Sequence, residues 1–511
     1  MTDIVAAIDS GTQSTRAYLF DTSMQPVASH QAAFTQKHPH PGWCEQDPMD
    51  IWLTVKECLA NALKEAEARI GPVTIRALGL ATQRETTIVW SKVTGLPLCN
   101  AIVWLDSRTS EICNRMEEEL GGKDYFRPVT GLPINNYFSA FKFKWMYENC
   151  EAVRDAVDQD QAYFGTLDSW LIYQLTGGLN GGIHVTDVTN AARTMLMDLD
   201  TCQWHEPFLP LFDIPASCLP RIVSNAEVYG YVAGMYGALK GIPISGCLGD
   251  QMAAVLGHRL TAGMAKNTYG TGCFMLLNTG PKRIRSRHGL LTTVCYKLGA
   301  DTPPCYALEG AVAVAGLGVS WLTKNLGILD SFMQAEELAL TVPDTGGVYF
   351  VPAFSGLLAP HWDDSARGVI LGLTGFSNKA HIVRAMLEAI CFQSREVLDS
   401  MRQDADIEGM HLLRVDGGAT KSDLLMQVQA DLLQTLVVRP NFQETTVLGA
   451  ALAAGLGAGV WSSELVFASS SYNNKEFKPA ITDEEADKRF ARWSKAVTRC
   501  LDLADLSLDE A

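Results

Sequence analysis

Short apolar runs in this chain alternate with turns that are rich in glycine, serine and threonine. Residues 4–8 are all apolar and predict a buried strand, and residues 17–21 predict its hairpin partner. The pattern recurs about halfway along, where residues 266–277 hold a Gly-Thr-Gly turn that leads into an apolar strand. Further on, residues 412–415 predict a strand running into a glycine turn, and residues 422–433 predict an amphipathic helix.

Other segments continue this alternation of strands and helices. Residues 57–69 carry apolar side chains on one face and predict a helix, and residues 75–81 predict a buried strand. Residues 163–175 predict a strand followed by a helix. Residues 448–459 predict a small-residue helix packed tightly against a neighbour, and the charged tail after residue 480 predicts one surface helix. Strands and helices in alternation are typical of the α/β class.

The length of the chain indicates more than one domain. A chain of 511 residues, 47% of them hydrophobic, is long enough for two or more folded cores. We place the boundary in residues 253–262, just before the second glycine-rich hairpin, which predicts domains over residues 1–254 and 255–511. Each half then holds one mixed sheet flanked by helices.

Charge and cysteine usage narrow the class of partner and the compartment. The net charge of −16 argues against nucleic acid and anionic membrane surfaces as partners. The 13 cysteines are scattered without metal-ligand spacing, which fits a reducing compartment. The sequence has no apolar run of membrane-spanning length. We therefore expect a soluble cytoplasmic protein. The chain ends in Leu-Asp-Glu-Ala, and a microbody matrix stays open if a targeting tripeptide has been removed.

The glycine-rich hairpins carry the first chemical signal. A tight turn such as residues 10–16 presents backbone N–H groups and hydroxyls to one point, as phosphate binding requires. Asp9 ends the first strand beside that point and can hold Mg²⁺ directly or through water. An ordinary polar hairpin is the alternative. Two such hairpins, one in each half, suggest two related domains closing on one nucleotide. The glycines at 417–418 would let the backbone approach a flat ligand such as adenosine.

Several longer motifs are more specific. They are ATQRETTIVW at 81–90, NAIVW at 100–104, GCLGDQ at 246–251, the stretch 264–274, YALEGA at 306–311 and DGG at 416–418. Through these motifs the chain resembles the FGGY carbohydrate kinases, and among them the branch that acts on glycerol. The similarity runs from residue 4 to about residue 493. The QRET and GDQ motifs separate that branch from its sugar-kinase relatives.

The resemblance implies both a fold and a reaction. The fold is a pair of actin/hexokinase-like, ribonuclease H-like domains with a central cleft. The reaction is Mg²⁺-dependent transfer of the γ-phosphoryl group of ATP to the primary hydroxyl of glycerol, which gives glycerol 3-phosphate and ADP. The resemblance also suggests a homodimer.

The resemblance also assigns an acceptor site. Residues expected to contact glycerol are Arg84, Glu85, Tyr137, Asp250 and Gln251, with Trp104 and Phe274 lying against its carbons. Asp250 is the candidate base that takes the proton of the attacking hydroxyl. The alternatives are that Asp250 only orients glycerol, that Arg84 and Glu85 form a surface ion pair, and that the aromatic rings are core residues.

A second set of residues is implied for the nucleotide. The phosphates are expected between Thr12, Gln13, Ser14 and Arg16 on one domain and Thr271 on the other, with adenosine near Gly316 and Gly418 and Mg²⁺ at Asp9. Gln13 stands where Thr is usual, Ser320 where Gln is often seen, and Ser422 where Asn is common. These exchanges keep a polar side chain but change its length, so the sequence does not fix the affinity for the nucleotide.

One loop and two alternative functions complete the sequence-based expectations. Residues 232–240 lack the Gly-Gly and Arg arrangement associated with sugar-bisphosphate inhibition in some bacterial relatives, so we expect that regulation to be absent. The nearest alternative function is an FGGY kinase for another short polyol or a pentulose. The more remote one is an actin-like or Hsp70-like ATPase, which gives no reason for Arg84 and Glu85 beside Asp250.

Overall fold

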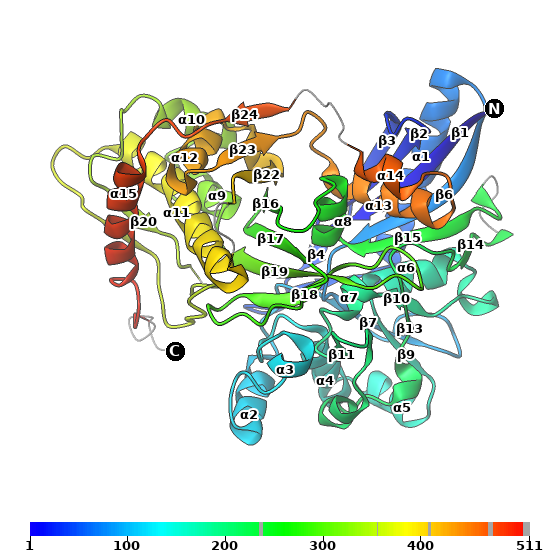
Figure 1. Ribbon diagram of the computed structural model, residues 1–511. Coiled ribbons are helices and arrows are strands. Elements are labelled where there is room, and N and C mark those ends of the chain that lie inside the picture. The colour runs from blue at the N-terminus through cyan, green and yellow to red at the C-terminus, as the bar shows by residue number, and fades with distance from the viewer. Residues whose placement is uncertain (235–238, 355, 407–409, 469–473, 504–511) are drawn as a thin grey trace.

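Two large mixed β-sheets, one in each half of the chain, organise the structure (Figure 1). The computed structural model describes residues 1–234, 239–354, 356–406, 410–468 and 474–503. The N-terminal half, blue to green, occupies the right and lower parts of Figure 1, and most of the later chain lies to the left.

The first sheet has six strands in the order β14-β15-β6-β1-β2-β3. The strands β1, β2 and β3 form an antiparallel meander, whereas β1, β6 and β15 run parallel. Their bounds are β1 Thr2–Ser10, β2 Ser14–Asp21, β3 Pro26–Ala33, β6 Val73–Thr82, β14 Gly230–Tyr231 and β15 Pro243–Gly249. The parallel strands therefore end at one edge of this sheet.

The second sheet repeats this plan. Its seven strands have the order β18-β19-β17-β16-β22-β23-β24, with β16, β17 and β19 antiparallel and β16, β22 and β23 parallel. The bounds are β16 Ala265–Tyr269, β17 Cys273–Gly280, β18 Leu291–Tyr296, β19 Cys305–Val312, β22 Leu412–Asp416, β23 Leu436–Arg439 and β24 Lys475–Phe477. Each half thus opens with a hairpin, as the two glycine-rich turns predict, and adds parallel strands to it.

A smaller sheet and three strand pairs lie outside these two sheets. The smaller sheet has the order β4-β5-β8-β7-β9, with bounds β4 Gln36–Lys37, β5 Glu45–Gln46, β7 Thr87–Ser91, β8 Ala101–Ile102 and β9 Ala162–Thr166. The pairs join β10 Val185–Asp187 to β13 Arg221–Val223, β11 Met197–Asp198 to β12 Gln203–Trp204, and β20 Tyr349–Val351 to β21 Val369–Leu371.

Helices cover the sheets. In the N-terminal half they are α1 Pro48–Ile70, α2 Ser110–Leu120, α3 Arg127–Thr130, α4 Ser139–Asn149, α5 Glu151–Asp158, α6 Leu167–Leu175, α7 Val188–Ala191 and α8 Asp250–Gly257. In the C-terminal half they are α9 Gly316–Lys324, α10 Phe332–Ala339, α11 Lys379–Ala405, α12 Asp423–Leu433, α13 Thr445–Gly457, α14 Ser463–Phe467 and α15 Asp483–Val497. Within the described ranges, none of the helices combines the length and apolarity needed to cross a bilayer.

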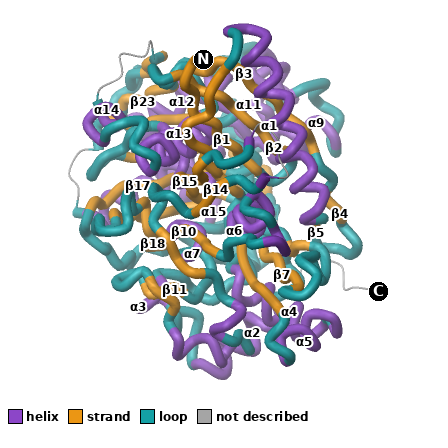
Figure 2. The backbone as a smooth tube through the Cα atoms, turned by 90° about the vertical axis from the view of Figure 1, so that its right-hand side faces the viewer, coloured by secondary structure: helices purple, strands orange, loops and turns teal. Residues whose placement is uncertain are grey.

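Alternate residues of β1 point to different helical layers, because successive side chains of a strand lie on opposite faces. Ile4 and Ile8 pack in one core cluster with α1 and α6, whereas Val5 and Ala7 pack in another with α8 and α13. Figure 2 shows α1 and α13 on opposite sides of β1. The second of these clusters also contains Leu276 and other residues of the second sheet, so α8 and α13 lie between the two sheets.

Close approach of α13 depends on glycines. A Cβ at Gly79 in β6 would overlap the backbone of Ala450, and a Cβ at Gly449 would overlap the carbonyl group of Ala253 in α8. This is the tightly packed small-residue helix that the sequence predicts for residues 448–459, although it spans Thr445–Gly457.

Other predicted elements are confirmed with changed limits. The helix expected over residues 57–69 begins at Pro48, because Asp47 caps its N-terminus and proline suits the first helical position. The predicted surface helix of the tail is α15. One of its faces is buried, since Trp493 is fully buried, so the helix is amphipathic. The predicted boundary region 253–262 begins inside α8, and the division at residue 254 stays a prediction.

We expect replacement of Gly449 by Ala to lower the free energy of unfolding by about 1–3 kcal/mol, as overpacking does. Alanine on its own favours a helix over glycine by about 1 kcal/mol, so a net loss would report the contact with Ala253. Urea denaturation measures this. Gly375, which has open space around it, is the matched control as Gly375→Ala. A Gly449→Ala variant as stable as the wild type would contradict the close approach.

Candidate active site

The carboxyl ends of the parallel strands of the first sheet carry the predicted acidic groups. Asp9 lies near the end of β1, opposite Ala81 of β6, and Gly249 at the end of β15 lies opposite Thr82. Arg84 and Glu85 follow β6 directly, and Asp250 begins α8 directly after β15. Ligands of open α/β sheets bind at this edge, where the strands end.

A cavity of about 140 Å³ opens at this edge. It is lined by Thr12, Arg84, Glu85, Trp104, Tyr137, Asp250, Gln251, Thr268, Gly270, Thr271 and Phe274. The structure therefore brings together every residue predicted for the acceptor, with one phosphate-side residue from each hairpin. Because the lining comes from both halves of the chain, the cavity lies between them.

Aromatic rings form one wall of the cavity. The ring centroid of Trp104 lies 5.6 Å from that of Tyr137 and 6.0 Å from that of Phe274, both edge to face. The indole Nε1 of Trp104 donates a hydrogen bond of 3.0 Å to Oγ1 of Thr12. The wall is thus fixed to the first hairpin and offers apolar surface to a bound carbon chain.

Asp250 faces the cavity from the first turn of α8. Its side chain keeps 28% exposure, and its Oδ1 lies 3.4 Å from Nε of Arg84. Oδ1 also accepts a hydrogen bond of 2.7 Å from the backbone N–H of Gln251. Burial raises the pKa of Asp250; Arg84 opposes this rise, and Glu85 adds to it. The group is therefore a stronger base than an aspartate in water.

Asp9 is the second perturbed carboxylate at this edge. Burial raises its pKa to about 7, although Arg16 opposes the shift, and Asp250 and Glu444 add to it. Nη1 of Arg16 lies 3.7 Å from Oδ2 of Asp9 and 3.0 Å from Oε2 of Glu444. A buried carboxylate that its neighbours leave only partly compensated suits a cation ligand, and its hard oxygens suit Mg²⁺.

The second hairpin carries the other predicted phosphate and adenosine residues. Its turn is closed by a 2.9 Å bond from the N–H of Gly270 to the carbonyl of Gly272. The backbone N–H of Gly316, at the start of α9, donates to the carbonyl of Gly270 at 3.0 Å. Gly316 therefore lies against the hairpin that holds Thr271. Ser320 lies one turn further along α9.

The third glycine turn lies at the end of β22. Gly418 begins a short 3₁₀ helix, and a Cβ added there would meet open space. The hydroxyl of Ser422 caps α12 by accepting from the N–H of Leu425 at 3.1 Å. Of the predicted nucleotide residues, all of them within the described ranges, only Thr12 and Thr271 line the cavity itself. Gln13, Ser14, Arg16, Gly316, Ser320, Gly418 and Ser422 lie outside its lining.

Sequence reasoning missed several buried ionic groups behind the cavity. Lys266 donates to Oε1 of Gln251 and, at 2.7 Å, to Oγ1 of Thr268. Burial lowers the pKa of Lys266 to about 8, although Asp416 and Asp250 oppose this. Oδ2 of Asp416, in the DGG motif, lies 2.7 Å from Nε2 of His258. Lys266 and Asp416 stand in motifs used for the family resemblance, but spacing alone does not reveal their contacts.

Glu309 and Arg193 were also missed. Arg84 donates two bonds of 2.7 Å to the two carboxylate oxygens of Glu309. Arg193 donates through Nε to Oε1 of Glu85 at 2.5 Å. Burial opposes ionisation of Glu309, but Arg193 and Arg84 outweigh it and lower its pKa to about 2. Glu309 belongs to the motif YALEGA, whereas no motif singled out Arg193.

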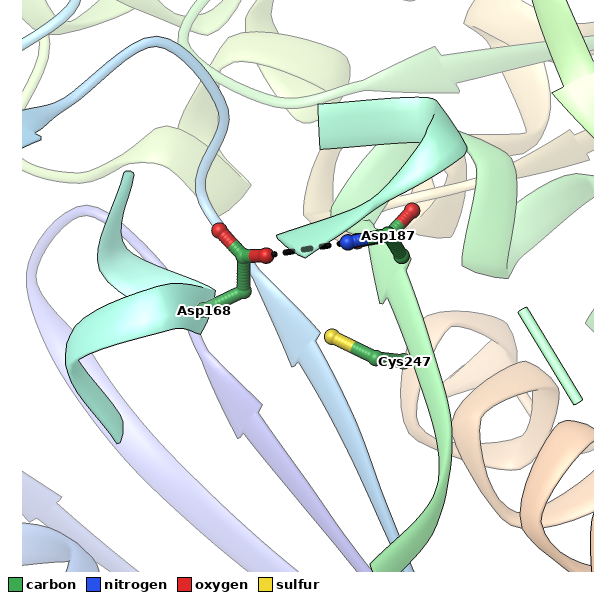
Figure 3. Close-up of side chains that lie close together, drawn as sticks. All are labelled: Asp168, Asp187 and Cys247. Atoms are coloured by element: carbon green, nitrogen blue, oxygen red, sulfur yellow. Dashed lines mark hydrogen bonds between the residues drawn. The ribbon is translucent and has the colours of Figure 1, made fainter. Parts of the chain in front are cut away.

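A separate cluster of two carboxylates and a thiol lies against β15 of the first sheet, the strand that carries Cys247 (Figure 3). One ligand-type atom from each of Asp168, Asp187 and Cys247 lies within 4.8 Å of the others. The carboxylates already accept hydrogen bonds from Thr166, Thr186, Thr189, Asn190 and Asn225. These donors satisfy the carboxylate oxygens, which favours a structural role for the cluster, although burial and the neighbouring Asp187 raise the pKa of Asp168 to about 7. Asp187 also caps α7.

Comparison with protein-family models and known proteins identifies the chain. The model of the N-terminal domain of the FGGY family of carbohydrate kinases matches residues 4–257, and the model of the C-terminal domain matches residues 265–458. The chain belongs to the FGGY family of carbohydrate kinases. It is 54% identical to a glycerol kinase of Arabidopsis thaliana, with 99% of each chain covered. It is 51% identical to a glycerol kinase of Brucella anthropi, covering 98% of this chain and 99% of that protein.

Solved structures agree with this FGGY assignment. The structure of Plasmodium falciparum glycerol kinase with ADP matches with a TM-score of 0.90, 40% identity and 98% of each chain covered. A xylulose kinase of Lactobacillus acidophilus matches with a TM-score of 0.84 at 22% identity, covering 97% of this chain and 98% of that one, which bears on the fold alone. The predicted pair of actin/hexokinase-like domains is thereby confirmed. The loop 232–240, on which the expected absence of sugar-bisphosphate inhibition rests, has residues 235–238 outside the described residues.

Proposed function

We propose that this FGGY kinase phosphorylates glycerol. The γ-phosphoryl group of ATP is transferred to a primary hydroxyl, and the products are glycerol 3-phosphate and ADP. The observation that carries the proposal is the cavity of about 140 Å³, in which Arg84, Glu85 and Asp250 face an aromatic wall. A small cavity with several polar groups and one apolar side suits a short polyol better than a pentulose. The names of the relatives, glycerol kinases at 54% and 51% identity, support the same substrate.

Each lining group has a role in this proposal. Arg84 donates to glycerol hydroxyls, Glu85 and Gln251 accept from them, and Trp104 and Phe274 lie against the carbons. Because phosphoryl transfer depends mainly on positioning and charge stabilisation, holding one hydroxyl in line with the phosphate is the main task.

Asp250 completes the transfer as the base. The attacking oxygen forms its bond to the γ-phosphorus while the bond to the ADP oxygen breaks, and the hydroxyl proton passes to Asp250. The pKa of Asp250, raised by burial, suits this step.

The nucleotide side is supported by the hairpins. Thr12 and Thr271 line the cavity from opposite halves, so phosphates between them would bridge the two hairpins. Gln13, Ser14 and Arg16 belong to the same first hairpin, with Gly316, Ser320, Gly418 and Ser422 on the adenosine side. Asp9 would hold Mg²⁺, which when bound neutralises charge on the phosphates. A homodimer, which the family resemblance implies, belongs to this proposal. So does a cytoplasmic location, which the cysteine usage favours, with a microbody matrix as the alternative if a targeting tripeptide has been removed.

The first test is ATP consumption by the purified protein with Mg²⁺, with and without glycerol. We expect glycerol to raise the rate by about a hundredfold or more, because without a positioned acceptor hydroxyl only water can take the phosphoryl group. The product is identified as glycerol 3-phosphate by mass spectrometry. Xylulose and erythritol serve as comparison acceptors. ATP use that is indifferent to glycerol, or faster with a comparison acceptor, would overturn the substrate assignment.

Replacement of Asp250 by Asn tests the base. Turnover should fall by about 10²–10⁴-fold, the usual contribution of a general base, while the KM for ATP stays near the wild-type value. In the wild type, kcat should decline as the pH is lowered through the raised pKa of Asp250, because only the ionised carboxylate accepts a proton. Asp301→Asn, at an exposed aspartate, is the control. Near-normal turnover of Asp250→Asn would leave Asp250 only an orienting role.

Replacement of Asp9 by Asn tests the metal assignment. The Mg²⁺ concentration for half-maximal rate should rise by about tenfold or more, as loss of a group that holds a metal does. The KM for glycerol should change little. Asp3 lies in the same strand but is exposed, so Asp3→Asn is the matched control. An unchanged Mg²⁺ requirement would exclude Asp9 as the metal residue.

A further inference from the structure

Five ionic side chains form a chain of alternating charge behind the cavity. Nε of Arg193 lies 2.5 Å from Oε1 of Glu85, and Nη1 of Arg193 lies 3.6 Å from Oε2 of Glu309. Nη2 of Arg84 lies 2.7 Å from Oε1 of Glu309, and Nε of Arg84 lies 3.4 Å from Oδ1 of Asp250. The order is therefore Glu85, Arg193, Glu309, Arg84, Asp250.

Only part of this chain reaches the substrate. Glu85, Arg84 and Asp250 line the cavity, whereas Arg193 and Glu309 do not. Both of the latter are completely buried, with 0% relative exposure. Glu309 lies on β19 of the second sheet, while the other four residues come from the first 250 residues of the chain. The chain of charges thus joins the two halves of the molecule.

Glu309 removes most of the orientational freedom of Arg84. Its two oxygens accept from Nη1 and Nη2 of Arg84 in a two-bonded fork, which fixes the plane of the guanidinium group. In that plane Nε of Arg84 is turned toward Asp250. If the charge of Glu309 were lost, the nearest carboxylate left to Arg84 would be Asp250.

Arg193 restricts two other residues of the cavity lining, Glu85 and Tyr137. It binds Glu85 through Nε, and its guanidinium carbon lies 5.2 Å from the ring centroids of both Tyr137 and Phe138. Glu85 has a positive φ of 59°, an uncommon conformation for a residue with a side chain. The contact to Arg193 therefore holds Glu85, and the cation–π contact holds Tyr137, where both line the cavity.

We propose that Arg193 and Glu309 are positioning residues of the acceptor site, which hold Glu85 and Arg84 in the geometry that binds the polyol hydroxyls. Glu309 holds Nη1 and Nη2 of Arg84, so that only Nε of Arg84 approaches Asp250. This inference rests on the proposed function. The competing explanation is a buried ion-pair network that supports only the fold.

The first test is Glu309→Gln, which keeps the shape of the side chain and removes its charge. The KM for glycerol should rise by about tenfold or more, and the KM for ATP should stay within about twofold, because the lost bonds hold only acceptor groups. Glu388→Gln is the matched control. Glu388 is also buried and also paired with two arginines, Arg489 at 2.7 Å and Arg384 at 3.2 Å, but it lies on α11 and not at the cavity. Equal KM changes in both variants would overturn the proposal.

A double-mutant cycle separates positioning from stability. If Glu309 acts through Arg84, the change Glu309→Gln should have no further effect on the KM for glycerol once Arg84 is Met. The double variant Arg84→Met with Glu309→Gln also removes both charges, so it avoids leaving one buried and unpaired if a single variant fails to fold. Additive effects on KM would show that Glu309 does not act through Arg84.

Arg193 is tested by rescue. Arg193→Met should raise the KM for glycerol, and Arg193→Lys, which keeps the charge near Glu85, should recover part of the loss. A value for Lys no better than for Met, together with an unchanged KM for ATP, would limit Arg193 to stacking on the aromatic rings and would overturn its role in holding Glu85.

One measurement does not depend on the substrate. A crystal structure of Glu309→Gln without ligands should show Nη1 or Nη2 of Arg84 moved from residue 309 to Asp250, and an unmoved Arg84 would overturn the proposal. If the wild type fails to phosphorylate glycerol, the proposed function fails, but this structure still decides whether Glu309 positions Arg84.

Discussion

A charge that is removed from water must meet an opposite charge, and this requirement links the two halves of this protein. Arg84 and Glu309 are almost completely buried, and neither has enough polar surroundings to stand alone. Arg84 comes from the first sheet and Glu309 from the second, so their pairing is satisfied only when both sheets have formed and met. The acceptor cavity lies where they meet. Its geometry therefore follows from the assembly of the whole chain rather than from one domain.

Burial at the place where the two sheets meet also explains the chemistry assigned to the site. Burial raises the pKa of both Asp9 and Asp250. Asp9 is therefore the candidate to bind a cation, and Asp250 is the candidate to accept a proton. The pKa of Glu309 is lowered instead, because Arg193 and Arg84 flank this carboxylate. Carboxylates near the place where the two sheets meet thus acquire different tasks through their neighbours alone.

Local sequence patterns predicted many of the strands and helices and the lining of the cavity. They did not predict contacts between residues that lie far apart in the chain. The strands β1 and β6, the two glycine-rich hairpins and the helix α13 follow from apolar runs and small residues. The acceptor lining follows from motifs that match the family. The partners of Arg84 do not, because Glu309 lies 225 residues away along the chain. The start of α1 at Pro48 was missed although its signal is local, since aspartate is a favoured cap and proline is common at the first helical position.

The position of α13 has a consequence for how the protein is made. This helix comes from residues 445–457, yet it covers one face of the sheet that the first 249 residues form. A ribosome adds about 5–20 residues per second, so roughly tens of seconds pass between synthesis of the sheet and synthesis of the helix that covers this face. During synthesis the N-terminal sheet therefore has one apolar face uncovered until α13 has been made. A message truncated before residue 445 would yield a chain whose earliest part cannot finish folding, although none of its own residues is missing.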